Sequence, residues 1–525
     1  MKKKSVNYLM QALTILLTVS SLLAGCAGVQ SSEATVSEEA VVETQEVNTA
    51  ADTSNVEQVE KTEIPKYIFL FIGDGMSYPQ IQSASYYLGA TGSDGGVDVK
   101  ELSFMDFPVV GSAQTFDKTS FCPDSASTAT SISTGNKTYS GTINMDTTMT
   151  EKFETISEKL KKQLGYKIGI LSTVNLNHAT PAAFYAHQES RNSYYDIGLE
   201  MISSNFDYFA GGGLKKVTGE EENQEDLYQL AQEAGYTVVK TQQEVNGVTS
   251  ADSKVIIIDE KLADSDSMAY EMDTDDTQLQ LSDYVKKGIE HLDNDTGFFM
   301  MIEGGKIDWA CHANDAAASI HDTIALDESV KAAIEFYEKH PDDTLIIVTG
   351  DHETGGLSIG YAGTNYDTYL TNLENQKISF AKFDTDYVEG YVENKTSFED
   401  VLKEVKANFG LMTAEDSDAA TNSNLVLTEY EYELLKTAYD RTLETGATDQ
   451  EEMSQEEYVL YGTYEPLSVT ITHILNNKSG ISFTSYSHTG IPVPVFALGN
   501  GQNQFEGYYD NTDIFNALKT LTGVK

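Results

Sequence analysis

Carboxylate and histidine side chains follow three uninterrupted apolar runs of the chain. Tyr67–Ile72 leads to Asp74, Phe298–Ile302 leads to Glu303, and Thr344–Thr349 leads to Asp351 and His352. Apolar runs without polar alternation are typical of parallel strands buried on both faces, and such sheets bind ligands beyond their carboxyl ends. Oxygen and imidazole ligands gathered at strand ends indicate a metalloenzyme.

Further ligand types lie close to these strand ends in the sequence. Asp308 and His312 are four residues apart after Glu303, and residues at this spacing share one face of a helix. A carboxylate and an imidazole suit zinc, although exposed Asp and His at this spacing are common without a metal. His488 precedes another apolar run, and a lone histidine there is more often an ordinary loop residue than a ligand.

A candidate nucleophile stands at an expected helix start. In the segment Cys122–Thr130, Pro and Asp occupy positions that helix starts favour, and Ser125 falls in the first turn. Free backbone amides and the helix dipole attract an anion there, so this serine could face a phosphate, although a capping serine is the simpler alternative. The chain holds 32 lysines but only two arginines, Arg191 and Arg441, so each arginine suggests a geometric need. The guanidinium of Arg191 could grip phosphate oxygens through two hydrogen bonds, whereas Arg441 is expected on the surface.

Alternating strand-like and helical patterns must position these residues. They predict an α/β fold, with a mainly parallel central sheet and helices on both faces. The expected strands are 67–72, 167–172, 255–258, 298–302, 344–348 and 493–498, and the expected helices are 152–164, 224–234, 278–292, 312–339 and 511–521. Between about 362 and 478 the sequence is acidic, rich in tyrosine and helical in pattern, which predicts an insertion. The insertion could shape substrate access or be a passive surface elaboration.

The amino-terminal region has the composition of an export signal. Residues 1–25 combine Lys2, Lys3 and Lys4 with an apolar stretch and end immediately before Cys26, which predicts a bacterial lipoprotein signal peptide and a lipid anchor on Cys26. An ordinary secretory peptide is the alternative. Residues 26–63 read as a disordered tether, and residues 64–525 as the folded domain. We therefore expect an exported protein, held on the outer face of the cytoplasmic membrane or in the periplasm.

The charge balance excludes one class of partner. Loss of residues 1–25 removes three lysines and no acid, so the formal charge goes from −48 to −51. Nucleic acid is not expected as a partner, because polyanion binding needs basic patches. Cys122 and Cys311 are too few for a disulfide framework, so two buried thiols are the default and a bridge between them is the alternative.

Taken together, the candidate catalytic and metal-binding residues form motifs that resemble those of one known family. The motifs that carry the resemblance are Gly73-Asp74-Gly75-Met76, Asp124-Ser125-Ala126, His178–Ala183, Ser190-Arg191, Glu303–Asp308 with His312, Asp351–Gly356 and His488-Thr489-Gly490. In type and order they resemble the alkaline phosphatases, and they span most of the chain after residue 66.

The resemblance implies a site with three metal ions. Asp308, His312 and His488 would hold a first zinc; Asp74, Asp351 and His352 a second; and Asp74, Thr180 and Glu303 a magnesium ion. It also implies hydrolysis of small phosphate monoesters, with Ser125 attacking phosphorus to give a phosphoserine and Arg191 holding two nonbridging oxygens.

Two positions fall in a variable part of the family pattern. His178 could sit beside the third metal or bind it directly, in which case that site could accept zinc, and Trp309 is expected to pack beside the site. Two other functions stay open from the sequence: a phosphodiesterase or sulfatase of the same superfamily, and a surface protein that binds phosphate or metal without turnover. A homodimer is also left open.

Overall fold

A ten-stranded sheet forms the centre of the computed structural model, which describes residues 64–275, 277–445 and 453–525. The strand order is β14-β2-β13-β8-β1-β7-β3-β4-β6-β5. Every neighbouring pair is parallel except those made by β13, which runs antiparallel to both β2 and β8. The mainly parallel sheet expected from the sequence is thereby confirmed.

The bounds of the ten strands are as follows: β1 Tyr67–Gly73, β2 Val109–Gln114, β3 Lys167–Asn175, β4 Tyr208–Gly212, β5 Thr237–Val239, β6 Val255–Ile258, β7 Phe298–Gly304, β8 Thr344–Gly350, β13 Val493–Gly499 and β14 Gly507–Asp510. All six predicted strands are present. The prediction missed β2, β4, β5 and β14, which are three to six residues long and three of which contain glycine, so that they lack the long apolar run used to find the others.

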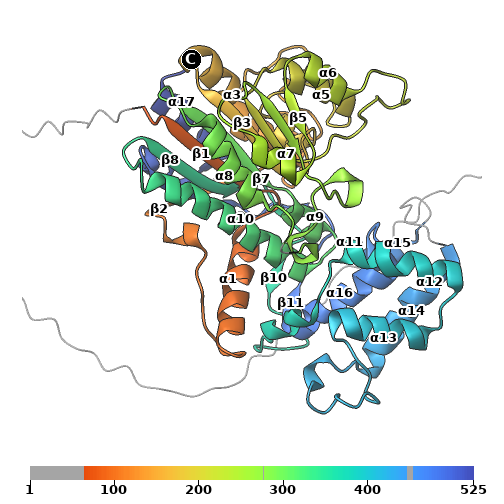
Figure 1. Cartoon of the computed structure of the whole chain (residues 1–525). Coiled ribbons are helices and arrows are strands. Elements are labelled where there is room, and N and C mark those ends of the chain that lie inside the picture. The colour runs from red at the N-terminus through yellow and green to blue at the C-terminus, as the bar shows by residue number, and fades with distance from the viewer. Residues whose placement is uncertain (1–63, 276, 446–452) are drawn as a thin grey trace, which may run out of the picture. The chain divides into compact units, whose positions relative to one another are not determined.

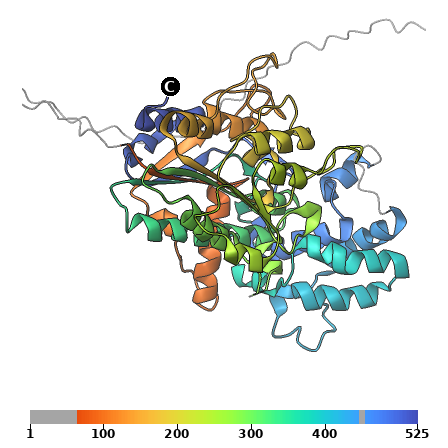
Figure 2. The same ribbon diagram turned by 45° about the horizontal axis from the view of Figure 1, so that its top comes forward.

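Helices cover both faces of the sheet because its central strands are buried on both sides. In β1, Tyr67, Phe69 and Phe71 join one apolar core, while Ile68, Leu70 and Ile72 join the other. The first core includes α1 (Tyr78–Gly92), α7 (Gln242–Gly247), α8 (Leu281–Leu292) and α10 (Ala316–Tyr337). The second includes α2 (Ser125–Thr134), α3 (Ile156–Lys159), α4 (Ala179–Ala182), α5 (Tyr194–Ser203), α6 (Leu227–Glu233) and α17 (Thr512–Thr522). Figure 2 shows the sheet between the blue α17 and the green α10.

The helix predicted over 312–339 is α10, Ala316–Tyr337, and a separate helix precedes it. Helix α9 (Lys306–His312) ends before a short turn, and α10 then begins at Ala316, where Asp315 accepts a hydrogen bond from the amide of Ala318. Asp315 is thus a helix cap that the apolar periodicity alone did not reveal. The predicted helix 152–164 is α3 followed by a π-helical turn at Leu160–Leu164.

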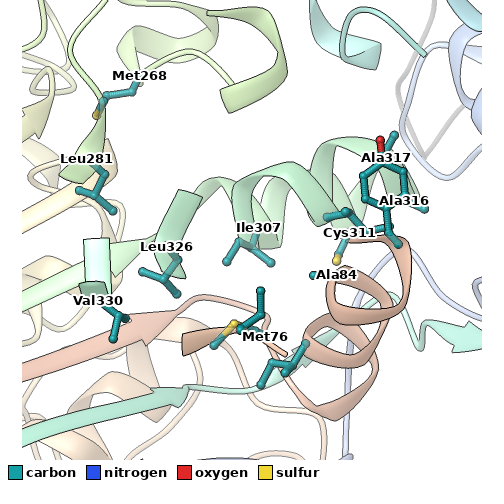
Figure 3. Close-up of a cluster of buried hydrophobic side chains, with 14 of the residues drawn as sticks. Met76, Ala84, Met268, Leu281, Ile307, Cys311, Ala316, Ala317, Leu326 and Val330 are labelled. Carbon is teal, nitrogen blue, oxygen red and sulfur yellow. The ribbon is translucent and has the colours of Figure 1, made fainter. Parts of the chain in front are cut away.

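The inner face of α9 packs on the segment that follows β1. Figure 3 shows Ile307 near Met76, and Cys311 near Ala84 of α1. These apolar side chains are fully buried or nearly so. Because Ile307 and Cys311 occupy the inner face, Asp308 and His312 project from a different face of the same helix.

The chain between about 362 and 478 is helical. It contains α11 (Phe380–Phe383), α12 (Glu389–Asn394), α13 (Phe398–Phe409), α14 (Glu429–Thr445), α15 (Gln455–Tyr461) and α16 (Pro466–Ser479), which gather in one region of Figure 1. We call these helices and their connections the helical region. Among the described residues, no helix is both long enough and apolar enough to cross a membrane. The predicted signal peptide, Cys26 and the tether lie outside the described residues.

Candidate active site

The carboxyl ends of β1, β7 and β8 bring three of the predicted ligands together. The strands are in register, with Gly73 opposite both Gly304 and Gly350, so that Asp74, Glu303 and Asp351 emerge at one edge of the sheet. Gly75 allows the turn after Asp74: its φ is +70°, and a Cβ there would lie 2.8 Å from Thr354 Oγ1. Its amide donates to Asp351 Oδ1 at 3.1 Å.

Two short antiparallel strands bring His352 and His488 to the same edge of the sheet. Strand β9 (Glu353–Thr354) pairs antiparallel with β12 (His488–Thr489), which places His488 opposite Thr354. The reversed direction of β13 makes this pairing feasible, because β13 begins at the edge where β8 ends. As a result, the rings of His352 and His488 stack with their centroids 3.6 Å apart.

Carboxylate and imidazole atoms converge closely enough to hold metal ions. Two groups have ligand atoms within 4.8 Å of one another: Asp308, His352 and His488, and Asp74, Asp351 and His352. His312 joins the first group, since its Nε2 lies 3.0 Å from His488 Nε2 and 3.3 Å from Asp308 Oδ2. His352 borders both groups, with its Nε2 3.5 Å from Asp74 Oδ1 and 3.3 Å from Asp351 Oδ2.

Hydrogen bonds orient all three imidazoles in the same way. The Nδ1 atoms of His312 and His488 lie 2.6 Å from the carbonyl oxygens of Tyr486 and Pro123, which can only accept, so each Nδ1 carries the proton. Thr354 donates to Asp308 Oδ1 at 2.5 Å and therefore accepts from His352 Nδ1 at 3.2 Å. In its neutral form each ring consequently presents an unprotonated Nε2, the form that binds a metal.

Asp74, Thr180 and Glu303 form an oxygen-lined group beside these histidines. Thr180 Oγ1 donates to Asp74 Oδ2 at 3.1 Å, and Ser172 donates to Glu303 Oε2. The other oxygens, Asp74 Oδ1 and Glu303 Oε1, are buried and accept a hydrogen bond from none of the described residues. Buried carboxylate oxygens without donors are costly unless a cation satisfies them.

The electrostatics of the cluster favour the binding of a cation. Burial and then the charge of Asp351 raise the pKa of Asp74 well above its usual value. Burial raises the pKa of Glu303 to about 8 and that of Asp351 to about 7. Burial also raises the pKa of Asp308, but the imidazoles of His312, His488 and His352, when protonated, outweigh it and hold this pKa well below normal. Carboxylates packed together in this way are typical of a cation site.

Ser125 is the first residue of α2 and lies at the edge of this cluster. Asp124 caps the helix by accepting from the amide of Ser127 at 3.1 Å, as the sequence predicted. The side chain of Ser125 is almost completely buried, and its Oγ lies 3.2 Å from His352 Nε2. The free amides of the first turn therefore point toward the place where an anion attached to Ser125 would sit.

Arg191 is held beside the same helix terminus. Its Nη1 donates to Asp124 Oδ2 at 2.9 Å, and its Nη2 lies 3.4 Å from His178 Nε2. Burial lowers the pKa of His178 to about 3, and the nearby guanidinium contributes to this shift. His178 is thus neutral and accepts from Arg191, and its ring packs edge-on against Trp309 with the centroids 5.9 Å apart. Among the described contacts, His178 is bonded to Arg191 rather than to the carboxylates of the oxygen-lined group.

Several residues that orient the predicted ligands could not be identified from the sequence. Ser172 stands opposite Glu303 in the β3–β7 ladder, and Thr128 Oγ1 donates to Asp351 Oδ2 at 3.1 Å. Glu353 accepts from Gln80 at 2.8 Å and from Thr489, which joins the β9–β12 ladder to α1. Only the pairing register could have indicated these partners, because serine and threonine are common throughout the chain.

Two expectations for residues outside the cluster were wrong. Cys311 is buried as expected, but Cys122 is exposed, and neither is in a disulfide. Arg441 is not a surface residue, because its side chain is only 15% exposed and its Nε lies 2.6 Å from Glu457 Oε1.

His187 lies in the segment before Arg191, between Glu158 and Glu200. Burial lowers its pKa, but these two carboxylates outweigh it and raise the pKa to about 9.

Comparisons with known proteins agree with this geometry. The family model described as "Alkaline phosphatase" matches residues 65–524. Alkaline phosphatase 4 of Bacillus subtilis (strain 168) is 30% identical over 483 residues, which cover 89% of this chain and 92% of the relative. Alkaline phosphatase 3 of the same strain is 30% identical over 469 residues, which cover 87% and 89%.

A solved structure shares the fold. The crystal structure of a cold-active alkaline phosphatase from a psychrophilic Shewanella sp. is 27% identical, with a TM-score of 0.70, and the match covers 87% of this chain and 99% of that one. The sequence motifs, the sheet, the buried cluster of carboxylates and histidines, and these relatives all indicate the same family. The chain belongs to the alkaline phosphatase family of phosphomonoester hydrolases.

Proposed function

We propose that the enzyme hydrolyses phosphate monoesters with the help of bound metal ions, through a phosphoserine on Ser125. The observation that carries the proposal is the position of the Ser125 hydroxyl. It lies at the amino terminus of α2, 3.2 Å from His352 Nε2 and at the edge of the buried carboxylate and imidazole cluster. A nucleophile, an anion-binding helix terminus and a cation site therefore meet at one atom.

The residues present fit three metal ions. The proposed ligands are Asp308, His312 and His488 for one zinc, Asp74, Asp351 and His352 for a second zinc, and Asp74, Thr180 and Glu303 for magnesium. Three observations support these sets: the Nε2 atoms converge, Asp74 Oδ1 and Glu303 Oε1 accept no hydrogen bond from the described residues, and the third group contains oxygen atoms only. Zinc favours nitrogen with oxygen, whereas magnesium favours oxygen alone.

When bound, the metal ions would act as Lewis acids that lower the pKa of the Ser125 hydroxyl and stabilise negative charge on the departing alcohol oxygen. The protein's own residues carry out the remaining tasks. Ser125 Oγ gives up its proton to solvent and forms a bond to phosphorus, while the bond from phosphorus to the ester oxygen breaks and this oxygen takes up a proton from solvent to become the alcohol. In the second step a water molecule loses a proton to solvent and attacks the phosphoserine, so that the bond to the Ser125 oxygen breaks, Ser125 Oγ is protonated again and inorganic phosphate is released.

Arg191 orients the phosphoryl group during both steps. Its guanidinium carries donors that Asp124 and His178 do not use, and a planar fork suits two nonbridging oxygens at once. We infer a positioning role for His178, because its Nε2 is bonded to Arg191 and its ring is packed on Trp309. Trp309 in turn fixes the position of the His178 ring.

The substrate class can be tested with two aryl esters. We expect p-nitrophenyl phosphate to be hydrolysed with a kcat/KM at least about 10²-fold higher than bis-p-nitrophenyl phosphate, because a diester offers Arg191 and the metal site one fewer charged oxygen. Steady-state rates on both esters at equal metal loading would check this. Faster turnover of the diester would favour the phosphodiesterase alternative, and faster turnover of p-nitrophenyl sulfate would favour a sulfatase.

The proposed cellular location is the outer face of the membrane, with the enzyme anchored through a lipid on Cys26. The charged, apolar and small-residue segments of residues 1–25 support export, and the position of Cys26 directly after Gly25 supports lipidation. In cells fed radiolabelled palmitate, the wild-type protein should incorporate label and the Cys26→Ser variant should not. Cys122→Ser is the matched control, because Cys122 is an exposed thiol in the folded domain. An unlabelled wild-type protein would contradict the anchor.

A further inference from the structure

A cavity of about 540 Å³ opens beside the candidate active site. At one end it is lined by the phosphate-binding residues, including Ser125, Arg191 and His488. Its lining also includes four aromatic residues and one alanine: Tyr270, Trp309, Phe380, Tyr464 and Ala381. A cavity of this size can accept an organic leaving group as well as the phosphoryl group.

The four rings form a continuous surface, which we call the aromatic wall. The ring centroids of Tyr270 and Phe380 are 5.8 Å apart, and those of Phe380 and Tyr464 are also 5.8 Å apart, both in edge-to-face contact. Trp309 joins the wall through the small core cluster that it shares with Tyr270 and Phe380. Trp309 also immediately follows Asp308, so the wall begins directly beside the proposed metal ligands.

A buried cation holds part of the wall in place. The ammonium group of Lys306 lies 3.8 Å from the ring centroid of Tyr270 and 4.7 Å from that of Trp309. The side chain of Lys306 is fully buried, and its Nζ donates to Asp264 at 2.7 Å and to Ser267 at 3.0 Å. Because the cation is fixed by these bonds, the two rings above it are already ordered before a ligand arrives.

The helical region supplies the rest of the wall. Phe380 and Ala381 belong to α11, and Tyr464 lies in the turn before α16. All three side chains are partly exposed, so that they remain accessible from the cavity. The cavity lining also includes Lys215, Asp384 and Asp264, and Asp264 is paired with the ammonium group of Lys306.

We propose that the aromatic wall is a subsite for the leaving group, and that it selects phosphate monoesters whose leaving group carries an aromatic ring. The inference rests on the proposed phosphomonoesterase function and names its preferred substrate class. It also assigns a role to the helical region, which would contribute Phe380, Ala381 and Tyr464 to substrate selection.

Contacts between the aromatic wall and a ring of the substrate should affect KM more than kcat. A ring that packs on Phe380 and Tyr464 in the bound substrate keeps this contact in the transition state, so the contact lowers KM and has little effect on the rate of the chemical step. An aromatic contact with burial of one ring face should raise kcat/KM by about tenfold.

Benzyl phosphate and ethyl phosphate are suitable probes, because both release alkoxides of similar basicity and differ mainly in the ring. For the metal-loaded wild-type enzyme we expect kcat/KM for benzyl phosphate to exceed that for ethyl phosphate by about tenfold. Cyclohexylmethyl phosphate serves as the control for size, and it should fall below benzyl phosphate because it cannot make edge-to-face contacts.

The wall is tested with the double substitution Phe380→Ala and Tyr464→Ala. We expect the benzyl-to-ethyl ratio to fall to about one, chiefly through a higher KM for benzyl phosphate. Phe380→Leu retains apolar volume and should lower the ratio less. Tyr430→Ala is the matched control, because Tyr430 is a tyrosine of the helical region that is 70% exposed and does not line this cavity. It should keep the wild-type ratio.

Two further measurements separate a lost subsite from a damaged enzyme. Inhibition by inorganic phosphate reports on Ser125 and Arg191 without any leaving group, so its inhibition constant should change less than twofold in the double variant. A wild-type ratio near one, or an equal loss for both esters together with weaker phosphate inhibition, would overturn the subsite. An enzyme that hydrolyses neither ester would instead contradict the proposed function.

Discussion

Ser125→Ala is expected to lower kcat on p-nitrophenyl phosphate by about 10⁴-fold or more while the protein retains its bound metal. The reason for the first effect is that the substitution removes the proposed nucleophile, the hydroxyl that lies 3.2 Å from His352 Nε2. The reason for the second is that the carboxylate and imidazole atoms of both ligand groups already lie within 4.8 Å of one another without Ser125, and the substitution leaves them in place. Steady-state kinetics and elemental analysis on the same sample would measure both.

Ser131→Ala provides the matched control for this substitution. Ser131 is buried on the same helix, but its hydroxyl donates to the carbonyl oxygen of Ser127 at 2.9 Å within the helix. Its loss should leave kcat within about twofold of wild type, since a bond of this kind contributes only modestly to stability. Full activity of Ser125→Ala would refute the nucleophile assignment, and a parallel loss of metal would mean that Ser125 acts in metal binding instead.

The sequence predicted the central fold well because the strands that position the site carry long apolar runs. β1, β7 and β8 are buried over their full length, and their in-register pairing brings Asp74, Glu303 and Asp351 together as expected. β4 was missed because two of its five residues are glycine, and β5 was missed because three residues leave little periodicity to detect.

The ligand types could be read from the sequence, but their mutual orientation could not. Asp351 and His352 are adjacent, and it is the short β9–β12 ladder that turns His352 toward His488. Each of these strands is two residues long, too short for any pattern. The tautomers likewise depend on Tyr486 and Pro123, which are distant in sequence from the rings that they orient.

Substrate selectivity was the least accessible property from the sequence. Phe380 and Tyr464 are two among many aromatic residues of the helical region, and nothing in their spacing distinguishes them from core residues such as Phe383. Their role becomes visible only when α11 and the turn before α16 meet Trp309 across one cavity. The sequence left open whether the insertion shapes substrate access or is a passive surface elaboration. The proposed subsite favours the first of these.

Removal of the metal ions is expected to have an effect as large as the loss of Ser125. Without cations, the buried carboxylates of Asp74, Glu303, Asp308 and Asp351 face one another with no compensating charge. Chelation should therefore lower kcat/KM by about 10³-fold or more and should also lower the melting temperature, because ions that bind only the folded state stabilise it.

The most direct test of the account measures metal content and phosphatase activity on one preparation, before chelation, after chelation, and after addition of zinc and magnesium. We expect two zinc ions and one magnesium ion per chain in the active enzyme. Activity should fall in step with their removal and should recover only when both metals are added back. Full activity on p-nitrophenyl phosphate with less than one metal ion per chain would contradict it.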